Sequence, residues 1–519
     1  MTSKTNAVVV ALVGAVVFAG CDNNGNGHFN YVLPEVTFTV MDPPTPAPLT
    51  RSIRFFTNMA LTPTVTVTGG GESFVVPASG FLSAEPAFSH HVMILGLKPA
   101  TTYAVDVTMV GPGGATNTET IQSITTNPLP ANFPPLEVRL ANPARSNGVT
   151  LFDVFPSAIN GAYFIAVDAT GDVVWYLPLP EVSEPDIRRM HNGNLLFLAK
   201  EGEDRAARQI NMLGETIAEV RDSDLHLRRF HHEMFEMENG HLLTYTIELR
   251  NLGPYLPENM FHDVVGENIT EITWDGQVVN DLRTLDILDP FRRLPDFNAP
   301  FYNADFGGIP TKDWAHGNAI VHDPHDDTYI LSLRHQDIVV KINRRGRIVW
   351  VLGQDFADTA GDNNWPFLTL LNGTYQTHQH AVEVIGENQI ILYDNANNSG
   401  GASRAVIYSI DPVSLTATQD YEYVDPTFDP PLCAPFVGDA DLVPGADGAE
   451  HVLVAHMGAS PHPAPCGVGP DNYILITEVD RQTKEKVFEI QVRDPDPAEG
   501  ESAAMTNGYR AERLPSLYP

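Results

Sequence analysis

Apolar residues along this chain occur in short runs of strand length, separated by glycine, asparagine and aspartate. The stretch 313–353 shows the pattern best, since it predicts two antiparallel hairpins, the second turning at Arg345-Gly346. The strands that we expect are residues 319–321, 329–333, 338–342 and 348–352. Four strands in roughly 40 residues match the size of one propeller blade.

Similar hairpins recur further along the chain. Short β-rich runs follow turn glycines at Gly171, Gly214, Gly276 and Gly346, at irregular spacings. A constant local pattern with variable spacing indicates blades of one propeller whose loops differ in length. Helical periodicity is nearly absent, and residues 284–294 are the best helix candidate. The fold class that we predict is therefore all-β.

A second repeat carries histidines. His232, His316 and His380 each precede an apolar strand that reaches a turn seven residues later. Equivalent positions in a propeller are related by rotation about the central axis. We therefore expect the three imidazoles to converge at one end of the inner strands.

The N-terminal part of the chain has a different pattern of strands from the repeated hairpins. Short strands fill most of residues 31–127, and the phrase at 97–103 resembles the tyrosine-capped turn of fibronectin type III domains. We predict a small fibronectin- or immunoglobulin-like β-sandwich there. A proline-rich linker at 128–135 separates it from the predicted propeller at 136–519.

The first residues have the features of an export signal. Residues 1–20 contain Lys4, then an apolar run too short for a permanent membrane span, then small residues before Cys21. This order resembles a bacterial lipoprotein cleavage site, with Cys21 lipidated and residues 21–30 as a tether. The alternative is an ordinary signal peptide with an incidental cysteine. In both cases we expect an exported protein of the periplasm or cell envelope, with the membrane contacted only through the lipid.

Two further cysteines are present in the chain. Cys433 and Cys466 lie in proline-rich loops, and in an oxidising compartment such a pair is expected to form a disulfide.

The 519 residues include 31 basic and 65 acidic side chains, a formal net charge of −34. That balance argues against nucleic acids and anionic membrane surfaces as partners. An anionic substrate would need a locally cationic pocket.

Three interpretations of the convergent histidines compete. They can be hydrogen-bonded structural residues of a binding propeller, or three ligands of a zinc or copper ion. The third interpretation is a metal-free anion site, because Arg334 offers a planar fork of donors and Asn318 a neutral donor. The guanidinium expected beside the histidines counts against a divalent cation.

The site motifs resemble those of the bacterial arylsulfate sulfotransferases. The resemblance covers the chain from about Leu151 to its end. It rests on residues 313–318, Asp323-Pro324, Asp326-Asp327, 332–337, Gln379-His380-Ala381, Tyr393-Asp394-Asn395, His231-His232-Glu233 and 509–519.

This resemblance implies a six-bladed propeller behind a sandwich, and an enzyme that moves a sulfuryl group from an aryl sulfate to a phenol. The donor would be a phenolic sulfate ester, and we expect neither a cofactor nor a metal. The sequence contains no GxxxxGK[ST] phosphate loop, in keeping with this expectation. A non-catalytic binding propeller and a metal-dependent propeller hydrolase or lyase remain alternatives. The sequence leaves open whether the protein is a monomer or a homodimer.

The resemblance also implies roles for individual residues. His380 would be the nucleophile of a ping-pong reaction through a sulfohistidine, with His378 as the competing candidate. His316, His232 and Arg334 would hold the sulfate oxygens, supported by Asn318. Either His232 or His316 would act as the general acid and base. Glu233 would orient a histidine or face solvent. Separately, the aromatic composition of the insertion 290–314 suggests that it supplies an apolar rim for phenolic rings.

Overall fold

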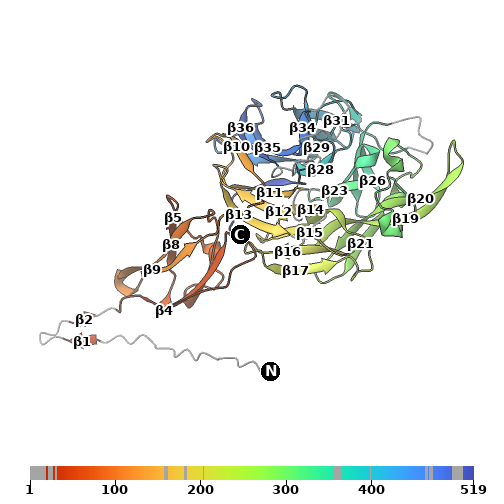
Figure 1. Cartoon of the computed structure of the whole chain (residues 1–519). Helices are drawn as coiled ribbons and strands as arrows, with labels where there is room; N and C mark the ends of the chain where they lie inside the picture. The colour runs from red at the N-terminus through yellow and green to blue at the C-terminus, as the bar shows by residue number, and fades with distance from the viewer. Residues whose placement is uncertain are drawn as a thin grey trace. The chain divides into compact units, whose positions relative to one another are not determined.

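Antiparallel β-sheets make up nearly all of the regular structure of the chain (Figure 1). This computed structural model describes residues 19–21, 27–29, 32–156, 162–179, 184–202, 204–355, 364–397, 399–461, 466, 472–493 and 506–519. Most of the expected export signal, residues 1–18, and the side chain of Cys21 lie outside the described residues. The all-β prediction is confirmed.

Chain contacts divide the protein into two compact units. The first comprises Met1–Leu129 and Tyr518–Pro519, and the second comprises Pro130–Leu517. The division falls inside the predicted linker, whereas the grouping of the last two residues with the first unit was not expected. No helix in the described ranges has the length and hydropathy needed to cross a membrane.

Two sheets with a shared core form most of the first unit. One has the order β3-β4-β7 and the other the order β6-β5-β8-β9. Their bounds are β3 Val36–Met41, β4 Arg51–Leu61, β5 Thr64–Gly69, β6 Glu72–Val75, β7 Ala87–Ile94, β8 Thr102–Val110 and β9 Thr116–Thr125. Buried residues alternate with exposed ones along β8, as expected for a strand with one face on a core. Tyr518 packs against this core, and its hydroxyl accepts a hydrogen bond from the Leu95 N–H.

The remaining elements of this unit are short. Strands β1 (Ala19–Cys21) and β2 (Gly27–Phe29) pair with each other, and two 3-10 turns follow at η1 (Ala78–Gly80) and η2 (Pro112–Gly114). The Tyr103 hydroxyl accepts a hydrogen bond from the Lys98 N–H at 2.9 Å. This contact matches the tyrosine-capped turn that the sequence predicts there.

Six sheets of mainly antiparallel strands form the second unit within the described ranges (Figure 1). The first three contain β11 (Val149–Pro156), β12 (Ala162–Val167) and β13 (Val173–Leu179); β14 (Glu184–Arg189), β15 (Leu195–Glu201), β16 (Asp204–Ile210) and β17 (Thr216–Arg221); and β18 (His231–Glu236), β19 (Leu242–Tyr255), β20 (Met260–Ile272) and β21 (Val278–Arg283). The last three contain β23 (Gly317–Asp323), β24 (Thr328–Leu333), β25 (Ile338–Asn343) and β26 (Ile348–Gly353); β28 (His380–Gly386), β29 (Gln389–Asp394), β30 (Arg404–Asp411) and β31 (Thr416–Tyr423); and β33 (Asp439–Pro444), β34 (Glu450–Pro461), β35 (Tyr473–Asp480) and β36 (Lys486–Val492).

The two ends of this unit complete each other's sheets. The late strand β38 (Ala511–Leu514) pairs with β11, and the early strand β10 (Leu136–Ala141) pairs with β36. Figure 1 shows β10 in orange beside β36 in blue. Short additional strands are β22 (Thr311–Asp313), β27 (Thr369–Leu370), β32 (Leu432–Cys433) and β37 (Thr506–Asn507).

In five of the six sheets, the first of the four main strands given above (the first strand) contacts the corresponding strand of a neighbouring sheet, and β38, which pairs with β11, completes the series. Strand β14 contacts β18, and the contacts continue through β23, β28 and β33 to β38, which in turn contacts β14. Strands β24 and β25 are buried on both faces, which explains their continuous apolar runs in place of alternation.

The predicted helix at 284–294 is mostly wrong. Helix α1 covers only Thr284–Ile287. Pro290 follows closely, and a proline disfavours helical conformation in the residue before it. Irregular chain with two 3-10 turns, η3 (Pro295–Asn298) and η4 (Ala304–Phe306), then leads to β22. A further 3-10 turn, η5 (Arg334–Gln336), follows β24.

The two remaining cysteines are joined. Cys433 and Cys466 form a disulfide with their Cα atoms 5.5 Å apart. Cys433 ends β32, which pairs with β34. The bond therefore joins the segment before β33 to Cys466, which follows β34 in the sequence.

Candidate functional site

Four of the five residues predicted for the site lie at the starts of neighbouring first strands, and Arg334 lies in η5, which follows β24. His380 opens β28, His232 is the second residue of β18, and His316 immediately precedes β23. The rings of His232 and His316 lie 4.9 Å apart. The ring of Tyr509 lies 6.1 Å from His232 and 6.4 Å from His380, so it connects the two. The structure thus brings the three histidines together.

The three histidines do not share one position in the β-ladders. His380 pairs with Tyr393 across β29, whereas in the corresponding sheet His231, not His232, pairs with Tyr245. His232 follows in a bulge and has a left-handed backbone with φ of 59°. Bulges re-aim side chains in this way, and they cannot be read from a turn-based alignment of the sequence.

His380 is buried and held in one tautomer. The two amide donors of Asn395 bind the carbonyl oxygens of Ala434 and Val437 at 2.7 and 2.8 Å. The Asn395 Oδ1 atom therefore faces His380 Nδ1, at 2.7 Å, and accepts its hydrogen. His380 Nε2 is left with a lone pair, which accepts a hydrogen bond from the Val437 N–H at 3.3 Å.

The surroundings of His380 keep its imidazole neutral. Burial lowers the pKa of His380 well below its ordinary value, and the nearby Arg334 guanidinium lowers it further. The positive charges that His232 and His316 can carry act in the same direction. A neutral imidazole whose unprotonated Nε2 has only a long hydrogen bond from the Val437 N–H is a competent nucleophile at neutral pH.

His378, the competing nucleophile, is in a different state. Its Nε2 lies 2.9 Å from Asp296 Oδ2, and its Nδ1 lies 3.1 Å from Asp337 Oδ1. Burial acts to lower the pKa of His378, but the two carboxylates more than offset it and the pKa is raised. Both ring nitrogens are therefore engaged, and the proton that blocks nucleophilic attack is stabilised.

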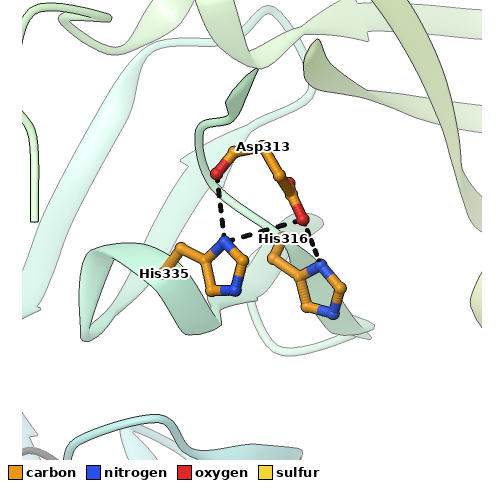
Figure 2. A group of neighbouring side chains, drawn as sticks. All are labelled: Asp313, His316 and His335. Carbon is orange, nitrogen blue, oxygen red and sulfur yellow. Dashed lines mark hydrogen bonds and ion pairs between the residues drawn. The ribbon is translucent and has the colours of Figure 1, made fainter. Parts of the chain in front are cut away.

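Asp313 lies at the Nδ1 edges of two imidazoles, those of His316 and His335, which stack on each other (Figure 2). His316 Nδ1 is 2.6 Å from Asp313 Oδ2, and His335 Nδ1 is 3.0 Å from the Asp313 carbonyl oxygen. Figure 2 shows the Nε2 edges of both rings turned away from Asp313. Burial raises the pKa of Asp313 to about 6, which leaves it largely ionised at neutral pH.

The same three residues have the geometry of a partial metal site. One ligand atom from each of Asp313, His316 and His335 lies within 4.8 Å of the others. Both Nδ1 atoms, however, already have an oxygen of Asp313 as hydrogen-bond acceptor. The Arg334 guanidinium also acts on Asp313 electrostatically and would disfavour a divalent cation there. These contacts favour a hydrogen-bonded cluster.

Arg334 brings largely uncommitted donors to the site. Its Nη2 donates to the Pro435 carbonyl oxygen at the long distance of 3.4 Å, and its buried Nε has no hydrogen-bond partner. Among the described residues it has no carboxylate within ion-pair distance. Burial lowers its pKa from the ordinary value, while Asp296 and Asp313 partly oppose this. A guanidinium in this state suits an incoming anion.

Asn318 and Gly317 support the site from β23. The Asn318 amide donates to the Gln379 carbonyl oxygen at 2.7 Å, directly before His380, and its Oδ1 is buried without a partner. A Cβ atom on Gly317 would lie 2.8 Å from the Tyr245 ring, so only glycine allows this approach. Asn318 therefore fixes the chain that carries His380.

Glu233 neither orients a site histidine nor faces solvent. It is buried and pairs with Arg188 at 2.5 Å and with Arg510 at 3.1 Å. Burial alone would raise its pKa, but the two guanidiniums outweigh burial and lower the pKa to about 2. Arg510 also contacts Asp186, Glu383 and Asp439 on three other first strands. This network lies in the interior of the unit.

Of the aromatic residues in the insertion, Phe301 lies exposed beside the site. Its side chain is 58% exposed, and its ring centre is 5.0 Å from that of His316. Tyr302 is buried against His231 and His316. Phe297 and Phe291 instead pack on Tyr255 in the core. The predicted rim is thus reduced to one exposed aromatic ring.

Sequence reasoning missed three residues of the site as functional candidates. Asn395, Asp313 and Tyr509 occurred in motifs but had no assigned roles. Asp313 lies three residues before His316, a spacing that could have suggested a hydrogen bond. Asn395 and Tyr509 reach the site through strand pairing and chain closure, which local spacing does not reveal.

Comparisons with known proteins identify a family for this chain. The family model described as Arylsulfotransferase (ASST) matches residues 141–509. The arylsulfate sulfotransferase AssT of Escherichia coli strain CFT073 is 26% identical over 322 residues, 51% of this chain and 51% of that protein. AssT of Lelliottia amnigena is 24% identical over 415 residues, 67% of this chain and 65% of that protein. The aligned regions thus span about half to two thirds of these relatives.

Solved structures resemble the chain only distantly. TolB from Acinetobacter baumannii covers 80% of this chain with a TM-score of 0.35 and 11% sequence identity. A similarity of this size supports no conclusion about the fold or the function.

Proposed function

Because the chain belongs to the arylsulfotransferase family, we propose that it transfers a sulfuryl group from an aryl sulfate ester to a phenol. One observation carries the proposal. His380 presents a neutral, unprotonated Nε2 beside the uncommitted donors of Arg334. A nucleophile next to an anion-binding fork is what attack on a sulfate ester requires.

The reaction proceeds in two transfers. In the first, His380 Nε2 forms a bond to sulfur, the bond between sulfur and the aryl oxygen breaks, and the leaving phenoxide takes a proton. In the second, the oxygen of an incoming phenol bonds to sulfur, the N–S bond breaks, and the phenol proton leaves to a base. The covalent sulfohistidine divides one difficult step into two easier ones.

His316 is our choice for the acid and base. Its Nδ1 lies 2.6 Å from the Asp313 carboxylate, which stabilises the imidazolium and directs Nε2 away from Asp313. His232 Nδ1 instead faces another imidazole nitrogen, that of His231, at 2.9 Å. A carboxylate partner suits a residue that alternately holds and releases a proton.

Arg334 and His232 stabilise the sulfuryl oxygens. Sulfuryl transfer resembles phosphoryl transfer, in which charge spreads over the equatorial oxygens of a loose transition state. Each positioned donor contributes roughly 2.7–4 kcal/mol by analogy with oxyanion-hole donors. Asn318 acts indirectly, because its amide fixes the Gln379 carbonyl next to His380.

The aryl group of the substrate packs on Phe301. This ring is exposed and adjacent to His316, and an offset or edge-to-face pair contributes about 0.5–1.5 kcal/mol beyond the buried area. It gives the site a preference for phenols over aliphatic alcohols.

We further infer that the second unit is a six-bladed propeller and that the first is a β-sandwich. The successive contacts between first strands support a closed ring, as does the pairing of β38 with β11. Arg510 adds support, since one guanidinium reaches the first strands of four sheets, at Asp186, Glu233, Glu383 and Asp439. The two sheets that share a core support the sandwich.

Export with a lipid anchor at Cys21 is part of the same proposal. The apolar run before Cys21 is typical of an export signal. The disulfide between Cys433 and Cys466 is typical of an oxidising compartment. Fractionation of the producing cells with intact-mass analysis tests it. A soluble cytoplasmic protein that retains residues 1–20 would contradict it.

The activity is tested with a chromogenic aryl sulfate, with and without an added phenol. We expect release of the chromogenic phenol to depend on the acceptor, with one sulfated acceptor formed for each donor consumed. Activity should persist after treatment with a chelator. Binding without turnover would favour a non-catalytic propeller, and chelator-sensitive hydrolysis would favour a metal-dependent hydrolase.

The nucleophile is tested by trapping. After donor is added without acceptor, intact-mass analysis should show one sulfuryl adduct on the wild type and on His378→Ala. The adduct should be absent in His380→Ala. The reverse pattern would transfer the role of nucleophile to His378.

A further inference from the structure

We propose that Asp447, His451 and Asp480 form a binding site for one divalent transition-metal ion, with zinc as the best match. The three residues come from two adjacent hairpins of the last sheet. Asp447 lies in the turn between β33 and β34, His451 is the second residue of β34, and Asp480 ends β35. None of them belongs to the His380 cluster, so this site is separate from the transfer chemistry.

The ligand atoms face one another at suitable distances. His451 Nε2 lies 3.6 Å from Asp447 Oδ1 and 3.9 Å from Asp480 Oδ2. One ligand atom from each residue falls within 4.8 Å of the others. Ligands bonded at about 2.1 Å around a tetrahedral ion are roughly 3.4 Å apart, so a small side-chain movement suffices.

The histidine is the strongest part of the argument. The His451 side chain is fully buried, and its Nε2 has no hydrogen-bond partner. Buried polar atoms without a partner are rare and costly. This one points toward two carboxylates, an arrangement that a bound cation would stabilise.

The tautomer of His451 is fixed from the other side. Its Nδ1 lies 2.7 Å from Glu478 Oε1. Glu478 also accepts hydrogen bonds from the Ser146 N–H and from Arg513, so its carboxylate is held as an acceptor. Nδ1 must then carry the hydrogen, and the Nε2 lone pair is available to a metal. Metal-binding histidines usually have such a carboxylate behind them.

Gly445 leaves these atoms accessible. A Cβ atom on residue 445 would lie 2.5 Å from His451 Nε2 and 2.6 Å from Asp447 Oδ1. Any other residue would therefore fill the space in front of both ligand atoms. Arg481, the residue after Asp480, pairs with Glu450 at 2.8 Å.

The ligand set selects the class of ion. One imidazole nitrogen with two carboxylates suits zinc or another first-row divalent ion, whereas calcium and magnesium prefer oxygen ligands alone. Asp447 is about half exposed, so water can complete the coordination. The Ala446 N–H donates to the Ala144 carbonyl just after β10, which links this turn to the strand that completes the last sheet. The ion would therefore stabilise the fold where the two ends of the unit meet.

The test uses the full chain after removal of metal with a chelator. Thermal unfolding and native mass spectrometry are recorded with zinc, manganese and calcium added separately. We expect one bound zinc ion and an upward shift of Tm of roughly 3 °C when zinc is in hundredfold excess over its Kd. Asp447→Asn and Asp480→Asn should each weaken zinc binding at least about tenfold.

Glu485→Gln is the matched control, because it removes one negative charge from the exposed turn between β35 and β36 without removing a ligand or the partner of Arg481. Its zinc affinity should stay within about twofold of the wild type, as should the transferase activity of every variant. The proposal fails if zinc binds and stabilises the aspartate variants as it does the wild type. It also fails if zinc has no effect while the aspartate variants lose stability without metal, because His451 would then be an imidazolium paired with the two carboxylates.

Discussion

The Asn395 Oδ1 atom lies 2.7 Å from His380 Nδ1, and this contact determines which nitrogen of His380 is free to react. The Asn395 amide cannot turn around, because its donors are bound to Ala434 and Val437. The loop before β33 thereby sets the tautomer of a histidine on β28. Asn395 is a positioning residue that acts through His380.

Replacing Asn395 tests this relationship through the pH profile. Asn395→Asp places a carboxylate against Nδ1 and stabilises the imidazolium, so the pKa of His380 rises and less neutral nucleophile is present at a given pH. We expect kcat/KM at pH 7 to fall about 10- to 100-fold, and the acid limb of the profile to move to higher pH by about one unit. Steady-state kinetics between pH 5 and 9 measures both.

The matched control is Asn372→Asp, the same change in a loop of the same sheet, where the Asn372 side chain forms hydrogen bonds with Gln419. Its profile should stay in place. A fall in kcat/KM for Asn395→Asp without movement of the acid limb would mean that Asn395 merely supports the fold.

The second prediction concerns Asp313 and the protonation of the leaving phenoxide. Asp313→Asn removes the negative charge that stabilises protonated His316, so the acid form needed by the leaving phenoxide is lost at lower pH. We expect kcat to fall about 10- to 100-fold for donors with poor leaving groups, with the basic limb moved to lower pH. Donors with strongly acidic phenols need less protonation and should be affected least.

The control for this experiment is Asp263→Asn, on the strand that pairs with β22, where the carboxylate contacts Asn251. An equal loss for all leaving groups in Asp313→Asn would contradict a role in proton transfer. It would indicate that Asp313 only keeps His316 and His335 stacked.

Phe301 is predicted to act on binding and not on chemistry. Phe301→Ala should raise the KM for a phenolic acceptor about five- to tenfold and change kcat by less than about twofold, because the lost contact stabilises substrate and transition state equally. Phe261, also 58% exposed but on β20, supplies the control variant Phe261→Ala. Equal KM values in the two variants would mean that Phe301 does not contact the aryl group of the acceptor.

The strands were predictable because their pattern is local. Turn glycines and apolar runs identify the two hairpins of 313–353, which the structure forms as β23 to β26. The helix at 284–294 was overestimated, because a periodic pattern does not register how strongly Pro290 restricts the preceding chain. Local pattern therefore predicted element type better than element length.

The site was predictable only in part, because it combines local and distant residues. His316 and Arg334 could be associated through one hairpin unit, whereas the contact of Tyr509 with His232 depends on closure by the end of the chain. The bulge at His232 could not be foreseen either, since its left-handed backbone is set by pairing with β19. Glu233 was misjudged for the same reason, because its partner Arg510 lies far away in sequence.

The opposite states of His378 and His380 lead to a last prediction, on stability against pH. The folded-state pKa of His378 is raised, so its stabilising contribution is fully present below the unfolded value near 6.5 and is lost as pH rises through the folded pKa. The pKa of His380 is lowered, so the folded protein resists its protonation and stability is lost as pH falls below the unfolded value.

The free energy of unfolding lost in His378→Gln should therefore be larger at pH 5.5 than at pH 8.5, whereas the loss in His380→Gln should be smaller at pH 5.5. Urea unfolding of the three proteins at both pH values measures the differences. Losses that change in the same direction with pH would mean that the two histidines carry the same charge, and would remove the basis for choosing His380 as the nucleophile.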